Sequence, residues 1–287
     1  MPAPTLSIKT PLVEQCEEAE VIHIQRQGET YAKLHPDKSV VVRPIPQGGV
    51  AIRTMFAFDG KLNRAVGCGK EGDMHDTTLR DLDLTFAIIG LSPELHLSPL
   101  ATSLTFQSLI TRGYVEKYEL TTYWGAPERL NTIESPNRAT GEMAVMTRRV
   151  TTHELNHFIE TSAAGFQSNG RPPELLRTLA RIATQRQDTR LYFALMGGEI
   201  VGTAALATID TSHGSVAHLY LDSTLPRHRG RGVQLALIQA RLQEAQQLRL
   251  PLVTTITRTG DGSARNAGRA GLRVAYTIPV LTRPKTL

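Results

Sequence analysis

Residues 217–234 read AHLYLDSTLPRHRGRGVQ, the pattern of a strand, a short basic glycine loop and the start of a helix. Apolar residues then recur at helical spacing, at Leu235, Ile238, Leu242 and Ala245. A helix N-terminus leaves backbone N–H groups unpaired and carries partial positive charge, and glycines let a ligand approach these amides closely. Because flanking arginines add full charges, the loop is predicted to hold a pyrophosphate.

Other phosphate-binding loops do not fit this stretch. No Lys-Ser/Thr pair follows the last glycine, and the three spaced glycines of a dinucleotide loop are missing. The stretch instead resembles the acyl-coenzyme A loop of the GNAT N-acetyltransferase superfamily, whose pattern is Arg/Gln-x-x-Gly-x-Gly/Ala. One register begins at Arg227 and matches fully. A second begins at Arg229, has the usual spacing from the proline, and puts Gln234 where the superfamily mostly has Gly or Ala. We favour the second.

The predicted elements around the loop agree with this resemblance, which covers roughly residues 141–284. From residue 143 the patterns predict strand, two helices, three strands, helix, strand, helix and strand, with capping-box spacing at Thr151 and Glu154. The N-terminal half predicts a helix over 14–24, a hairpin over 48–66, then a glycine loop, helix, strand, helix and strand. It looks like a degenerate first copy that lacks the arginine-glycine loop.

The expected fold class is therefore α/β (α+β), with tandem GNAT-like domains, each a mixed, mostly antiparallel twisted sheet flanked by helices. A length of 287 residues is sufficient for two hydrophobic cores. The expected divisions are a loose N-terminus at 1–12, a degenerate GNAT-like domain at 13–125, a linker at 126–140 and an acetyl-coenzyme A-binding GNAT domain at 141–287.

A second glycine-rich segment, residues 67–72, has the spacing of a dinucleotide loop. Glu71 and Asp73 would repel a phosphate there, so we interpret the segment as a flexible connection.

Composition and charge restrict the function classes. The net charge of +5 is modest, which suits a small polyanion better than a nucleic-acid groove. Cys16 and Cys68 are far apart and predict neither a disulfide framework nor a zinc site, and the dispersed histidines predict no metal site. The N-terminus lacks a leader pattern and no apolar stretch is long enough to span a bilayer, so we expect a cytoplasmic protein without nucleic-acid or membrane partners. A homodimer is left open.

The resemblance implies where acetyl-coenzyme A binds. In the superfamily, a backbone amide at a bulge of the central strand polarises the thioester carbonyl. By position this falls on Ser223, Thr224 or Leu225, with Thr224 the best match. An asparagine near the coenzyme A arm corresponds to Asn266, for which a solvated helix position is an equal alternative. The expected cofactor-binding residues are Ser223, Thr224, Leu225, Arg229, Gly230, Arg231, Gly232, Val233, Gln234 and Asn266.

Acyl transfer to an amine needs a base, because only the neutral amine attacks. The period of two along a strand predicts His218, Tyr220 and Asp222 on one face, and His218 is the type of residue that titrates near neutrality. Packing for His218 and a turn role for Asp222 are the competing interpretations.

A thiolate acid is less clearly marked in the sequence. Many superfamily members place a tyrosine four residues before the glycine that ends the last helix, and here that position is Ala267. Tyr276 on the last predicted strand, a water molecule or no acid at all are the remaining possibilities.

These inferences predict an N-acetyltransferase that moves the acetyl group of acetyl-coenzyme A to a small-molecule amine by direct attack. The principal alternative is a non-catalytic acyl-coenzyme A sensor or interaction module. A third is acylation of a hydroxyl group or of a carrier-bound thioester.

Overall fold

The structure is a computed structural model that describes residues 10–130, 144–167 and 170–284. It divides into two compact units, the first made of Met1–Thr122 and Val274–Leu287 and the second of Tyr123–Arg273. The last strand of the chain thus belongs almost entirely to the first unit. Most of the predicted N-terminal segment and of the predicted linker lies outside the described residues, and the domain boundaries stay a prediction.

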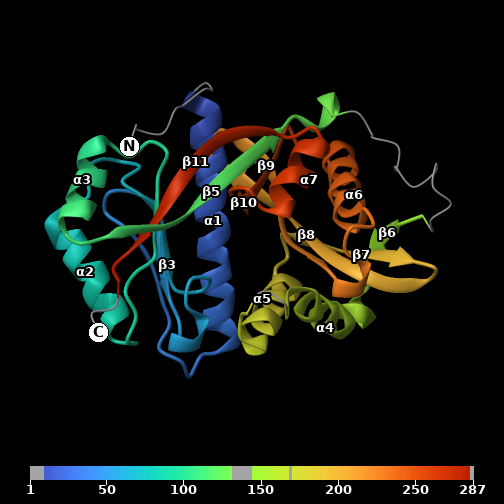
Figure 1. Cartoon of the computed structure of the whole chain (residues 1–287), viewed down its shortest axis with the longest axis horizontal. Coiled ribbons are helices and arrows are strands. Elements are labelled where there is room, and N and C mark those ends of the chain that lie inside the picture. The colour runs from blue at the N-terminus through green and yellow to red at the C-terminus, as the bar shows by residue number, and fades with distance from the viewer. Residues whose placement is uncertain (1–9, 131–143, 168–169, 285–287) are drawn as a thin grey trace. The chain divides into compact units, whose positions relative to one another are not determined.

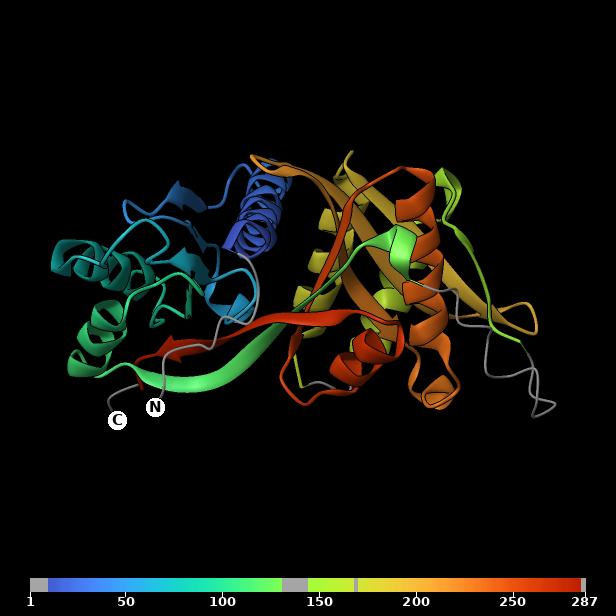
Figure 2. The same ribbon diagram turned by 90° about the horizontal axis from the view of Figure 1, so that it is seen from above.

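The first unit is a mixed sheet with strand order β1-β2-β3-β4-β11-β5. Its elements are α1 (Thr10–Leu34), β1 (Val41–Pro44), β2 (Val50–Arg53), a 3-10 turn (Phe56–Phe58), β3 (Arg64–Cys68), α2 (Asp76–Ala87), β4 (Leu95–Leu97), α3 (Ser103–Thr111), β5 (Val115–Gly125) and β11 (Arg273–Thr282) (Figure 1). Strands β3 and β4 are parallel. Strands β5 and β11 are neighbours in the sheet and run side by side as long ribbons (Figure 2).

Helices cover both faces of this sheet. Ile24 of α1 packs with Ile52 and Val66, whereas α2 and α3 pack on the face that carries Ala65 and Leu95. In strands, successive side chains point to opposite faces, so the neighbours Ala65 and Val66 serve the two layers.

The predicted hairpin is present, with shorter strands. Val50 faces Val66 across the antiparallel pair β2 and β3. The first strand ends at Arg53 because the Asn63 side chain takes over the next backbone groups. Its Oδ1 accepts from Thr54 N–H at 2.6 Å and its Nδ2 donates to Met55 C=O at 2.6 Å. The N-terminal helix is longer than predicted and runs over Thr10–Leu34.

The second unit has the strand order β10-β9-β8-β7-β6, antiparallel except for the parallel pair β9 and β10. Its elements are a 3-10 turn (Pro127–Arg129), β6 (Met146–Arg149), a 3-10 turn (Thr152–Glu154), α4 (Leu155–Phe166), α5 (Pro173–Gln185), β7 (Thr189–Met196), β8 (Glu199–Thr211), β9 (Gly214–Thr224), a 3-10 turn (Pro226–His228), α6 (Val233–Gln247), β10 (Leu252–Arg258) and α7 (Gly262–Arg269). This is the predicted order, except that the last predicted strand, β11, belongs almost entirely to the first unit. The mixed, mostly antiparallel fold class is confirmed.

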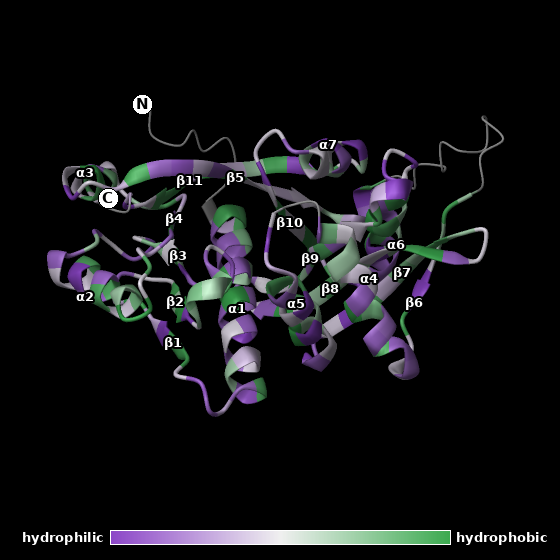
Figure 3. Cartoon of the chain, turned by 60° about the horizontal axis from the view of Figure 1, so that its bottom comes forward, coloured by the Kyte–Doolittle hydropathy of each residue, from purple (hydrophilic) through white to green (hydrophobic). Residues whose placement is uncertain are grey.

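Two layers of helices enclose the second sheet. Helices α4 and α5 pack on the face that carries Phe193 and Ala205, and α6 and α7 pack on the face that carries Leu219 and Val253. Figure 1 shows the two helix pairs on opposite sides of β8. The helices carry both hydrophilic and hydrophobic residues, as helices with one buried face do (Figure 3). The predicted capping box of Thr151 and Glu154 is present.

Within the described ranges, no helix has the length and apolar character that a membrane span requires.

Candidate functional site

The glycine loop leads directly into α6. Gly230 and Gly232 have φ of +78° and +77°, the left-handed region, and a Cβ at either position would meet no atom within 4 Å. Gly232 is the N-cap of α6, offers no side-chain cap, and is followed by no acid in the first turn. The first N–H groups of a helix have no partner within it, so this end of α6 is suited to an anion. The helix start just after Gly232 fits the register that begins at Arg229.

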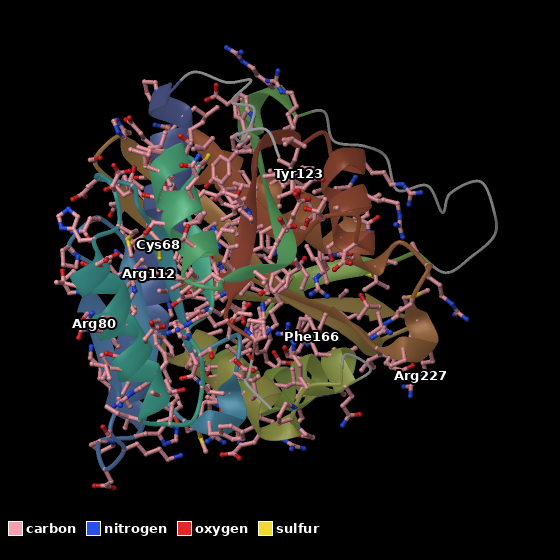
Figure 4. All side chains as sticks on the ribbon, turned by 60° about the vertical axis from the view of Figure 1, so that its left-hand side comes forward. Cys68, Arg80, Arg112, Tyr123, Phe166 and Arg227 are labelled. Atoms are coloured by element: carbon pink, nitrogen blue, oxygen red, sulfur yellow. The ribbon has the colours of Figure 1, made fainter. Side chains whose placement is uncertain are left out.

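The three arginines of the loop have different partners. Arg227 lies at the surface (Figure 4) and forms an ion pair with Glu199. Arg229 Nη2 donates to Gly165 C=O at 2.9 Å, and its Nε approaches Thr224 C=O at 3.4 Å. Arg231 is exposed and pairs with no acid in the described part of the chain. Arg229 therefore ties the end of α4 to β9, and Arg231 is the loop cation open to an anion.

Strand β9 bulges just before the loop. Tyr220 faces Ala205 and Ser223 faces Thr203, so Leu221 and Asp222 together oppose the single residue Ala204. Leu221 has φ of +57°, a left-handed conformation that L residues rarely adopt. The extra residue interrupts the alternation of side chains along the strand.

This bulge corrects the predicted common face of β9. His218 and Tyr220 do share a face, with ring centroids 6.2 Å apart. Asp222 does not share it, because its carboxylate binds Arg241 of α6, on the other side of the sheet. The expectation that period two extends to Asp222 is wrong, since that rule holds only for an unbroken strand.

The predicted carbonyl-binding amides differ in their surroundings. Leu225 N–H donates to Val201 C=O at 2.9 Å. Leu225 and Val201 are therefore a hydrogen-bonded pair of the antiparallel ladder. Because such pairs alternate with non-hydrogen-bonded pairs, Thr224 and its facing residue Gly202 are a non-hydrogen-bonded pair. The N–H of Thr224 consequently points away from β8, toward the side where β10 pairs with β9 only over residues 216–219. The Leu225 amide is occupied, whereas the Thr224 amide faces the point where the two strands separate.

Helix α4 approaches this part of β9 through a glycine. A Cβ at Gly165 would lie 2.6 Å from Ser223 Oγ and 3.1 Å from Thr224 N, so only glycine fits. Ser223 Oγ in turn pairs with Thr203 Oγ1 at 2.8 Å, and both side chains are buried. Phe166 follows Gly165 at the end of α4 and is labelled in Figure 4. The Ser223 side chain is thus a packing contact of the bulge.

Two predicted cofactor-binding side chains meet at the start of α7. Asn266 Nδ2 donates to Gln234 Oε1 at 2.8 Å, and Gln234 Nε2 donates to Ser263 Oγ at 2.9 Å. The glutamine that replaces the usual Gly or Ala therefore connects the first turn of α6 to α7. Asn266 is half-buried and anchored, which differs from a freely solvated helix position.

His218 is buried beneath the point where β9 and β10 separate. It is 3% exposed, and its Nδ1 lies 3.1 Å from Thr254 Oγ1 on β10. Tyr220 is partly exposed, and its hydroxyl lies 2.9 Å from Thr189 Oγ1. The Arg186 guanidinium lies over the Tyr220 ring at 5.7 Å. Burial raises the pKa of the Tyr220 phenol above its ordinary value, so the hydroxyl keeps its proton at neutral pH.

Tyr276 belongs to the first unit and is not brought together with these residues inside the second unit. It is 4% exposed. Burial, followed by the nearby carboxylate of Glu17, raises its pKa well above the ordinary value.

Arg241 was not predicted from the sequence, and its side chain is 0% exposed. Leu237, Arg241 and Ala245 are spaced four residues apart on the buried face of α6, and this pattern could have marked the arginine as a buried partner of an acid.

No group of three or more His, Cys, Asp or Glu in the described residues is arranged to hold a metal ion.

The comparisons with known proteins agree with this geometry. Residues 156–269, which include the loop and Asn266, match the Acetyltransferase (GNAT) family model. No curated protein matches the chain.

Solved structures of similar fold extend over most of the chain. A GCN5-related N-acetyltransferase from Kribbella flavida is 18% identical with a TM-score of 0.62, over 94% of this chain and 96% of that one. A functionally unknown conserved protein from Staphylococcus epidermidis ATCC 12228 is 11% identical with a TM-score of 0.56, over 87% and 97%. A GCN5-related N-acetyltransferase from Sphaerobacter thermophilus is 15% identical with a TM-score of 0.56, over 86% and 77%.

At these identities the solved structures show the fold, and the family model adds the activity class. The resemblance that the loop indicated is confirmed. Residues 156–269 form an acetyltransferase domain of the GNAT family, and the protein is an acyltransferase that takes its acyl group from acetyl-coenzyme A.

Proposed function

We propose that the second unit transfers the acetyl group of acetyl-coenzyme A to the amine of a small molecule by direct attack. The observation that carries this proposal is the pairing of an uncapped, acid-free start of α6 with a bulged β9 whose Thr224 amide faces the strand separation. The first feature suits the pyrophosphate of the cofactor. The second offers a hydrogen-bond donor for the oxygen that becomes negative when the amine adds to the carbonyl.

Direct attack is favoured over a covalent enzyme intermediate. The chain has two cysteines, Cys16 and Cys68, and both are buried in the first unit. Burial raises the pKa of each thiol to about 12, so neither supplies a thiolate nucleophile near neutral pH. In the direct reaction the amine nitrogen bonds to the carbonyl carbon, the carbon–sulfur bond breaks, the amine loses a proton and the thiolate gains one.

The predicted acid–base residues contribute unequally to this proposal. His218 is buried against Thr254 and Asp222 is bound to Arg241, so we assign neither of them as the base. The attacking amine then enters neutral and releases its proton to water, and positioning and polarisation supply the acceleration. Tyr220 is a half-buried residue that keeps a protonated hydroxyl two residues before Asp222, and we assign it as the proton donor to the leaving thiolate.

We assign acetyl-coenzyme A binding to the second unit alone. The first unit repeats the order strand, helix, strand, helix, strand with a parallel pair, as a degenerate copy would. The glycine-rich segment of the first unit, residues 67–72, is unsuited to a phosphate because acids lie close to it in the chain. The Asp73 carboxylate accepts from the hydroxyls of Thr102 and Thr105, and Asp76 places an acid in the first turn of α2.

A non-catalytic acyl-coenzyme A sensor is the alternative that the engaged His218 and Asp222 favour. It would bind the cofactor through the same loop without release of thiol. Calorimetric titration with coenzyme A and acetyl-coenzyme A, followed by a thiol-release assay over a panel of small amines, distinguishes the two. Release that depends on an amine supports the transferase, tight binding without release over the whole panel supports the sensor, and absence of binding refutes both. Hydroxyl acceptors in the same panel test acylation of oxygen.

A further inference from the structure

One buried arginine joins α6, β8 and β9 around the bulge of β9. The Arg241 side chain is fully buried, and its Nε donates to Leu237 C=O at 2.9 Å within α6. Its Nη1 donates to Ala205 C=O of β8 at 2.9 Å and approaches Tyr220 C=O of β9 at 3.4 Å. The guanidinium also holds the Asp222 carboxylate with both terminal nitrogens, Nη1 at 3.0 Å from Oδ2 and Nη2 against Oδ1.

These partners are the residues that define the bulge. Ala205 and Tyr220 face each other in the last regular pair before it, and Asp222 is the second of the two residues that oppose Ala204. Between them lies Leu221, whose positive φ is unfavourable and persists only if its surroundings hold it. A single cation therefore fixes both strands and the displaced residue at once.

The chemistry of the pair favours this geometry over simple packing. Removing two charges from water is unfavourable, and apolar side chains of similar volume often stabilise a core as well or better. The planar guanidinium, however, can bind a carboxylate with two parallel bonds while it donates to carbonyls at its edge. No apolar pair could specify the position of two backbone carbonyls and a carboxylate in this way.

We infer that Arg241 and Asp222 are positioning residues for acyl transfer, which hold the β9 bulge so that the Thr224 N–H meets the acetyl carbonyl. This inference rests on the proposed function of the loop and the bulge. It assigns Asp222 a role through Arg241 and the backbone, in place of the base that the sequence suggested. The pair stands apart from the glycine loop, so its loss is expected to spare the affinity for coenzyme A.

A binding ratio tests the inference without an identified acceptor. Acetyl-coenzyme A and coenzyme A share the pyrophosphate, and only the former carries the carbonyl. We expect the wild-type chain to bind acetyl-coenzyme A more tightly than coenzyme A. In Asp222→Asn and Arg241→Lys this preference should fall about 5-fold or more, the range of one hydrogen bond, while the Kd for coenzyme A stays within about 2-fold. The carbon-13 resonance of [1-13C]acetyl-coenzyme A should shift on binding to the wild type and return toward its free position in the variants.

Glu244→Gln is the matched control. Glu244 lies on the same helix and pairs with Arg149 and Arg190, so its loss removes ion pairs from α6 away from the bulge. The control should lower the Tm and leave the binding ratio and the carbonyl resonance unchanged.

A double variant keeps the test valid if the single variants do not fold. Arg241→Met with Asp222→Leu removes both charges at similar volume, which buried pairs often tolerate. If it folds and loses the preference for acetyl-coenzyme A, the inference is supported. If any folded variant of the pair keeps the wild-type ratio of affinities for acetyl-coenzyme A and coenzyme A, the inference is overturned. It is also overturned if the wild type binds both ligands equally. Failure of the wild type to bind coenzyme A at all would instead refute the proposed function of the loop.

Discussion

Replacement of Gly232 distinguishes the effect of this glycine on stability from its effect on the affinity for coenzyme A. Its φ of +77° lies in the left-handed region, and a side chain there would meet no atom within 4 Å. Gly232→Ala and Gly232→Glu should therefore cost only the backbone strain of an L residue, about 1 to 2 kcal/mol. For a chain with units of this size, that corresponds to a Tm lower by roughly 2 to 8 °C.

The effect on binding should be larger for the charged variant. If a pyrophosphate occupies the start of α6, a carboxylate at position 232 lies about 5 Å from a phosphate charge. At an effective dielectric constant of about 20 the repulsion is about 3 kcal/mol, a loss of affinity of over about a hundredfold. The methyl group of Gly232→Ala only hinders approach to the amides, and we expect a loss of about tenfold.

Gly113 provides the matched control. It lies between α3 and β5 of the first unit, has φ of +79°, and is likewise surrounded by open space. Gly113→Ala and Gly113→Glu should lower the Tm by a similar amount without any change in affinity. Calorimetric titration with coenzyme A measures the effect on binding and differential scanning calorimetry the effect on stability. If Gly232→Glu binds coenzyme A as the wild type does, the assignment of the loop is refuted.

Three further substitutions test individual side chains. His218→Ala removes a buried ring that contacts Thr254, so turnover should fall by the same factor at every pH from about 6 to 9. A loss of turnover that varies with pH would identify His218 as a base. Tyr220→Phe should lower kcat about tenfold or more while the KM for acetyl-coenzyme A is unchanged, and a lower Tm with unchanged kcat would show that the hydroxyl has a structural role, such as its bond to Thr189. Burial raises the pKa of Glu17 from 4.5 to about 7, so its carboxyl group contributes full stability below pH 4.5 and loses it as the pH rises toward 7. Glu17→Gln should thus be more stable than the wild type at about pH 8, by about 3 kcal/mol, and equal to it at about pH 4.5, in urea unfolding at the two pH values.

The sequence predicted best what depends on neighbours along the chain. The helix that follows Gly232 begins where the glycine and the spacing of Leu235 and Ile238 indicate, because a helix start is a local event. The capping box of Thr151 and Glu154 was predictable for the same reason. Local patterns of strand, helix and turn residues also predicted the element order around the loop, which the structure confirms.

The parts that were not predicted depend on contacts between distant residues. Nothing local marks Leu221 for a left-handed conformation, since leucine rarely adopts it. The contact that we infer to hold this conformation comes from Arg241, 20 residues further along the chain, which binds the neighbouring Asp222. Tyr276 was assigned to the loop-bearing domain by its place in sequence, whereas the contacts of the final strand put it in the first unit. Sequence order alone does not indicate which sheet a final strand joins.

The departure of Gln234 from the superfamily pattern also depends on contacts between distant residues. A small residue at this position would leave the first turn of α6 open toward α7. Here the amide group of Gln234 accepts a hydrogen bond from Asn266 and donates one to Ser263. The larger side chain is therefore directed to α7, and the open surroundings of Gly230 and Gly232 are preserved. Gln234 thus departs from the sequence motif, but the physical requirement of the motif is still met, because the amides at the start of the helix stay exposed.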